Sequence, residues 1–78
     1  MKSYEIVDNI MWLEIHVYSP QEMPTDFFEV LKGFAVSHTY HGETLVLFFP
    51  DESEADLEII EMLCENLKLE GYSESIQE

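Results

Sequence analysis

The beginning of the chain contains two stretches with the hydrophobic pattern of β-strands. Residues 4–7 form a short, largely apolar run, and residues 10–18 alternate between two faces. A period of two residues, rich in β-branched and aromatic side chains, is typical of a half-buried strand. With Asp8-Asn9 as the turn, the two stretches are predicted to pair as a hairpin. The second stretch carries one apolar face, with Met11, Leu13, Ile15 and Val17, and one mixed face, with Trp12, Glu14, His16 and Tyr18.

A short helix is predicted next. Residues 19–24 contain two prolines and interrupt the strand pattern. Apolar residues then recur at helical spacing, which predicts a helix over residues 26–32, capped by Thr25 or a neighbour and ended by Gly33. The apolar side of this helix is expected to carry Phe27, Val30, Leu31 and Phe34.

A second hairpin is predicted after this helix. Residues 36–40 and 43–49 have strand character and flank His41-Gly42, a two-residue loop that ends in glycine. Residues 45–49 are apolar at every position, so this strand is expected to be central in the sheet, with both faces at least partly covered. Pro50 is expected to end it.

The longest helix is predicted over residues 51–68, with Asp51 or Ser53 as its N-cap. Its apolar stripe consists of Leu57, Ile60, Leu63, Cys64 and Leu67. Residues 72–76 are expected either to form a short last edge strand or to fray. The order β-β-α-β-β-α predicts a single α+β domain over residues 1–78, with two helices on one face of a mainly antiparallel sheet.

Composition adds the strongest functional signal. Seventeen acidic residues stand against three lysines, there is no arginine, and the formal net charge is −14. Such a chain is repelled by DNA, RNA and anionic membranes, whereas a protein with a basic surface is attracted to it. No apolar run approaches the ~18 residues needed to span a bilayer, and residues 1–5 are not a charged region followed by a long apolar stretch, as in a signal peptide. We therefore expect a cytoplasmic protein, in its own cell or, if phage-encoded, in a host cell.

Candidate metal sites are weak. His38, His41 and Glu43 are close in sequence, but residues three apart in a strand point to different faces, and no cysteine joins them. The acidic segment that starts at Asp51 has Asp56 and Met62 where an EF-hand loop needs glycine and glutamate. We predict no metal and no other cofactor.

Catalytic equipment is also missing from the pattern. Cys64 lies among apolar helical positions and is predicted to be a buried thiol rather than a nucleophile. The three glycines are isolated, so no phosphate-binding loop is formed, and without arginine little can stabilise an anionic transition state. We predict a binding protein and not an enzyme.

The acids are concentrated on the last predicted helix. Glu54, Glu58, Glu61 and Glu65 follow spacings that align them on one face, with one carboxylate every ~5–6 Å, against a phosphate every ~3.4 Å along one DNA strand. Asp51 and Glu52 extend this stripe.

Two interpretations of the stripe stay open. Acids in the first turn offset the helix dipole, and a face of glutamates also keeps a protein solvated, as in halophile-like proteins. However, Glu54–Glu58 and Glu61–Glu65 are like-charge pairs that each destabilise the helix by about 0.2–0.5 kcal/mol. This avoidable repulsion favours a functional negative field.

An aromatic strand face is a second candidate surface. Trp12, His16 and Tyr18 share one side of a strand, and Val46 and Phe48 belong to another strand. If both helices cover the opposite face of the sheet, these side chains are exposed and mark a partner interface or a homodimer seam. If the sheet is covered on both sides, they are core.

In size, charge and lack of catalytic residues, the chain resembles small phage- and plasmid-encoded anti-defence proteins, including DNA mimics and anti-CRISPR proteins. The resemblance is limited to these general properties, and no sequence motif is shared. It implies an inhibitor or decoy that occupies a basic, nucleic-acid-binding surface of another protein, with the acidic stripe as the contact. The alternative hypothesis is a host accessory, immunity or antitoxin-type protein that docks through Trp12 and Tyr18.

Overall fold

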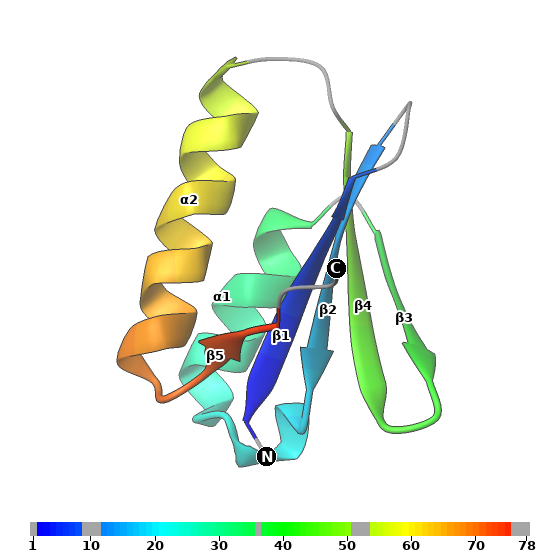
Figure 1. Ribbon diagram of the computed structural model, residues 1–78, viewed down its shortest axis with the longest axis vertical. Helices are drawn as coiled ribbons and strands as arrows, with labels where there is room; N and C mark the ends of the chain where they lie inside the picture. Colours follow the sequence, from blue (N-terminus) through cyan, green and yellow to red (C-terminus); the bar gives the residue numbers. More distant parts are fainter. Residues whose placement is uncertain (1, 9–11, 36, 51–53, 76–78) are drawn as a thin grey trace.

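The computed structural model describes residues 2–8, 12–35, 37–50 and 54–75, with only the backbone described for residues 50 and 54–57. The elements follow the predicted order and end in a short fifth strand (Figure 1). They are β1 (Ser3–Asp8), β2 (Trp12–Tyr18), the 3-10 turn η1 (Pro20–Glu22), α1 (Thr25–Phe34), β3 (Ser37–His41), β4 (Thr44–Pro50), α2 (Glu54–Leu69) and β5 (Ser73–Glu74).

The five strands form one sheet in the order β3-β4-β2-β1-β5. All neighbouring pairs are antiparallel except β1 and β5, which run parallel. The prediction that residues 45–49 form a central strand is confirmed, because β4 lies between β3 and β2. Leu45, Val46 and Leu47 are at most 1% exposed, so both faces of this strand are covered.

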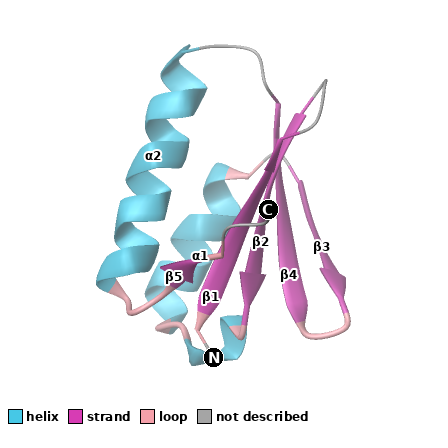
Figure 2. Ribbon diagram, viewed as in Figure 1, coloured by secondary structure: helices cyan, strands magenta, loops and turns pink. Residues whose placement is uncertain are grey.

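Both helices pack on the same face of the sheet, as predicted (Figure 2). The apolar alternation of β2 explains this, because Leu13, Ile15 and Val17 are buried against the helices while their neighbours point the other way. In α2 the predicted stripe is buried at Ile60, Leu63, Cys64 and Leu67, and the side chain of Leu57 lies outside the described residues. Neither helix among the described residues is long and apolar enough to cross a bilayer.

The boundaries and the apolar side of α1 differ from the prediction. Thr25 is the first helical residue rather than the cap, and Pro24 occupies the N-cap without a side-chain hydrogen bond. Gly33 does not end the helix, because it does not adopt a left-handed φ and the chain leaves the helix only at Ala35.

Burial on α1 is also narrower than the pattern predicted. Leu31 is fully buried and Phe27 is partly buried, but Val30 and Phe34 are 52% and 43% exposed. A ten-residue helix on a sheet contacts it along one line. Here that line passes through Leu31, so the apolar side chains on either side of it remain exposed to solvent.

The turn of the second hairpin lies one residue later than predicted. His41 pairs with Thr44, which leaves Gly42 and Glu43 as the loop. Gly42 has φ +63°, the conformation expected of glycine at the first central position of a tight hairpin turn. The turn predicted to begin at Asp8 also differs, because Asp8 is the last residue of β1 and pairs with Leu13. Asn9 and the predicted cap at Asp51 or Ser53 lie outside the described residues.

Candidate functional site

Six acids were predicted to form a contact stripe on α2. The structure describes the side chains of three of them. Glu58, Glu61 and Glu65 are all exposed. Glu54 begins the helix, but its side chain is not described. Asp51 and Glu52 lie outside the described residues.

No cation neutralises these glutamates within the described part of the chain. Lys32 pairs with Glu29 at 3.5 Å on α1. The Lys2 ammonium donates a hydrogen bond of 3.0 Å to the carbonyl of Glu70. Lys68 is exposed in the last turn of α2, where a positive charge stabilises the helix dipole. Lys68 lines the same hollow as Glu61 and Glu65, so the described α2 face carries one positive charge beside three negative ones and remains net negative.

The surface around the glutamates is not purely polar. Glu58, Glu61 and Glu65 line a shallow hollow together with Asn66 and Met62, which is 48% exposed. Glu61 and Glu65 also line a second hollow, between α2 and strands β1 and β5. Carboxylates that border exposed apolar atoms suit a basic side chain, because its aliphatic stem can pack while its head is paired.

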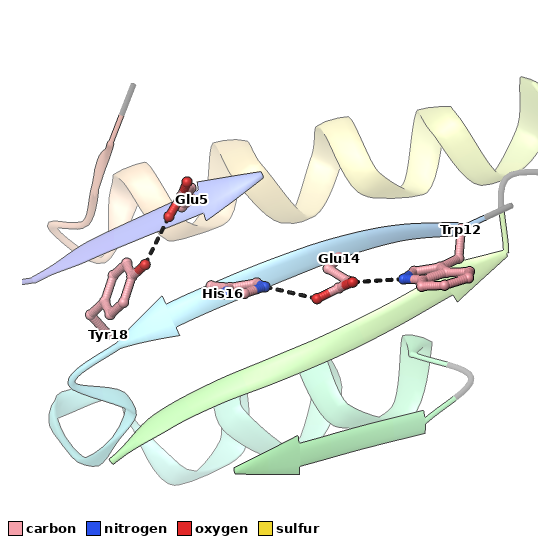
Figure 3. Close-up of polar contacts among 5 residues, drawn as sticks. All are labelled: Glu5, Trp12, Glu14, His16 and Tyr18. Carbon is pink, nitrogen blue, oxygen red and sulfur yellow. Dashed lines mark hydrogen bonds and ion pairs between the residues drawn. The ribbon is translucent and has the colours of Figure 1, made fainter. Parts of the chain in front are cut away.

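The second candidate surface is the face of the sheet opposite both helices (Figure 3). The Trp12 indole N–H donates to Glu14 Oε2 at 2.6 Å, and His16 Nε2 lies 2.9 Å from Glu14 Oε1. Trp12 itself is 42% exposed. The sheet is therefore not sandwiched between helices, and one carboxylate holds the tryptophan and the histidine along β2.

A buried carboxylate completes this face. Glu5 of β1 is only 6% exposed and accepts a hydrogen bond of 2.8 Å from the Tyr18 hydroxyl. This hydrogen bond, together with partial burial, raises the pKa of Tyr18 above its usual value. The tyrosine ring is consequently held in one position, as a neutral phenol.

The expectation that Val46 and Phe48 are exposed on this face is wrong. Val46 belongs to this face but is only 1% exposed, and Phe48 is partly buried. In the sheet register Val46 lies between His16 on β2 and Thr39 on β3. Among the large apolar side chains that the structure describes on this face, Trp12 is therefore the exposed one.

The histidines and the cysteine do not form a site in the described residues. His38 is opposite Leu47 and His41 is opposite Thr44, so the two histidines point to different faces of β3. No group of three residues that could hold a metal ion is found in the described ranges. Cys64 is buried, as predicted, and burial raises the pKa of its thiol, which disfavours the reactive thiolate.

Comparisons with known proteins give no further guidance. Searches of protein-family models, of curated proteins and of solved structures each found no match to the chain.

Proposed function

We propose that the protein is a small acidic inhibitor that occupies a basic, nucleic-acid-binding surface of another protein through the exposed face of α2. The observation that supports this most is that Glu58, Glu61 and Glu65 are exposed and unpaired with any cation in the described residues. In a chain of net charge −14, these side chains form a negative field that a basic partner would neutralise.

The energetics of the helix agree with this proposal. Glu61 and Glu65 are one turn apart, and like charges at that spacing destabilise a helix by about 0.2–0.5 kcal/mol. Lysines or arginines of a partner would relieve the repulsion and release counterions, as they do on DNA. A phage-type anti-defence protein that mimics nucleic acid is the most specific form of this proposal.

The sheet face supports a second candidate function, that of a host accessory, immunity or antitoxin-type protein. Trp12 is exposed, and its indole N–H is fixed by Glu14. Tryptophan is enriched at the energetic centre of interfaces, and a side chain that is already fixed loses little entropy on binding. In this case the docking surface would be β2 and not α2.

The test begins with a pull-down of partners from a lysate of the native host cells, at low and at high salt. Each captured protein is purified, and its association rate with the wild-type chain is measured against ionic strength. Its binding to duplex or guide nucleic acid is then measured with and without the chain. A decoy is expected to displace the nucleic acid from its partner.

Variants separate the two candidate functions. The double variant Glu61→Lys, Glu65→Lys is expected to slow association at least tenfold and to flatten its salt dependence. As a control, Asp8→Lys makes the same change in net charge as Glu65→Lys alone, at an exposed position on β1, and should have a smaller effect than that single variant. Binding unchanged in the α2 variant contradicts the proposal. Loss of binding in Trp12→Ala, with the fold retained by circular dichroism, favours the sheet face instead.

A further inference from the structure

A groove lies away from both surfaces, between η1, the beginning of α1 and the β3–β4 hairpin. Its volume is about 300 Å³. Pro20 and Met23 are buried and form its apolar base, while Phe28 and Tyr40 contribute aromatic rings. The carboxylate of Glu43, in the hairpin turn, is at the exposed rim. We call this feature the hairpin groove.

The lining of the hairpin groove has the chemistry of a cation site. Aromatic faces attract ammonium and guanidinium groups, and an apolar base accommodates the aliphatic stem of a long side chain. The protein already contains one such arrangement, because the Lys32 ammonium lies 4.5 Å from the Phe28 ring centroid and 3.5 Å from Glu29. Since Lys32 and Glu29 neutralise each other, Glu43 is the uncompensated charge at the groove.

We propose that the hairpin groove binds an arginine side chain of the basic partner. The basic character of the partner rests on the proposed function, whereas the affinity of the groove for a cation follows from the residues that line it. Arginine suits it better than lysine, because the planar guanidinium stacks on Tyr40 while its fork of N–H groups donates to the carboxylate of Glu43. A second copy of this chain is a poor occupant, since it contains no arginine and carries the same charge of −14.

The groove is held in place before any ligand arrives. Ser19, which leads into η1, adopts the left-handed region at φ 61°, an unusual conformation for a residue other than glycine. Its carbonyl accepts a hydrogen bond of 2.8 Å from the Tyr72 hydroxyl. This contact anchors η1 to the chain that follows α2. On the other side, the Tyr40 ring meets His38 edge-on at 6.4 Å between centroids. A preformed site loses less entropy when a side chain enters it.

The approach to the groove is also open. Tyr40 belongs to β3, which is the edge strand of the sheet and pairs only with β4. All five residues of β3 are exposed. An extended partner segment can therefore reach the groove along an edge that the described residues leave uncovered.

The proposal is tested with a small probe rather than with the unidentified partner. The ¹⁵N-labelled protein is titrated at about 150 mM salt, where long-range attraction is screened. The probe is a capped Gly-Arg-Gly peptide, and its control has citrulline, a neutral isostere, in place of arginine. We expect the arginine peptide to shift the amide signals of Thr25, Tyr40, Gly42 and Glu43, and the citrulline peptide to leave them in place.

Matched variants locate the interaction. Tyr40→Ala should weaken binding of the arginine peptide by about 2- to 5-fold, and Tyr40→Phe, which keeps the ring, should retain it. Glu43→Gln should weaken binding by a similar factor. Asp8→Asn removes the same charge at an exposed position outside the groove and should leave binding unchanged.

Three results would overturn the proposal: equal shifts with arginine and citrulline, shifts confined to α2, or a loss in Glu43→Gln no larger than in Asp8→Asn. Shifts confined to α2 would leave the proposed function intact. Conversely, arginine-specific shifts in the groove, combined with a partner that ignores the α2 variants, would support the groove and contradict the acidic α2 surface.

Discussion

At the scale of single residues, Tyr4 is the polar side chain with the least favourable surroundings. Its ring is fully buried in the core, and its hydroxyl has no hydrogen-bond partner in the described part of the chain. An unsatisfied buried hydroxyl destabilises the folded state by about 1–3 kcal/mol. Burial, with a smaller contribution from the neighbouring Cys64 thiol, raises the pKa of Tyr4 from 10.0 to about 12.

This shift predicts a specific loss of stability in alkali. Above pH 10.0 the hydroxyl ionises in the unfolded chain, whereas in the folded protein it stays protonated up to a pKa of about 12. The stability due to this difference is fully present below pH 10.0, is lost as the pH rises to about 12, and is on the order of 2–3 kcal/mol. Urea denaturation of the wild type and of Tyr4→Phe as a function of pH measures it.

The variant provides the control for the alkaline effect. Tyr4→Phe should be at least as stable as the wild type near neutral pH, because it removes only an unpaired hydroxyl. Above pH 10.0 it should lose less stability, although Tyr18 and Tyr72, whose pKa values are also raised, will keep part of the decline. Parallel alkaline curves for the two proteins would show that Tyr4 is not the group responsible.

At the scale of elements, two glycines are expected to respond in opposite directions to alanine. Gly42 has φ +63°, so Gly42→Ala forces a side chain into the left-handed region and should destabilise the protein by about 1–2 kcal/mol. Gly33 lies inside α1, has an ordinary helical φ, and leaves open space for a Cβ. Gly33→Ala should therefore stabilise by about 0.5–1 kcal/mol. Thermal and urea unfolding check both, and equal effects would contradict the assigned conformations.

Gly33 also shows why some elements could be predicted from the sequence and others could not. The central strand and α2 were predicted because burial dominates them, and apolar periodicity reports burial directly. The end of α1 was not, because a glycine after a lysine resembles a C-cap whether or not its φ is positive. The exposure of Val30 and Phe34 depends on where α1 crosses the sheet, which periodicity does not encode.

The candidate sites divide in the same way. Exposure of Glu58, Glu61 and Glu65 followed from helical spacing, which is local. The contact between Tyr18 and Glu5 depends on the register of the β1–β2 hairpin, and the hairpin groove joins residues 20–28 to the separate β3–β4 hairpin. A correct register would have indicated the first, since diagonal neighbours across a hairpin interact. No sequence signal indicated the second.

At the scale of the whole molecule, charge and stability oppose each other. The net charge is −14, and two of the three lysines are engaged locally, Lys2 with a carbonyl and the Tyr72 ring, and Lys32 with Glu29 and the Phe28 ring. Self-repulsion of this kind disfavours the compact state, and salt screens it. The free energy of unfolding in urea is therefore expected to rise when sodium chloride is added.

The neutral double variant Glu61→Gln, Glu65→Gln shows what the acids of α2 contribute to this repulsion. If they only repel each other, the variant should be more stable than the wild type at low salt, by a few tenths of a kcal/mol, and should gain less from added salt. A more stable variant would mean that the chain carries these acids against its own stability, as a surface that attracts a basic partner would require. A less stable variant would mean that the acids support the fold, and the solvation interpretation would then be the better one. The association rates of the wild type and of this double variant with a captured partner then show whether the same acids also promote binding.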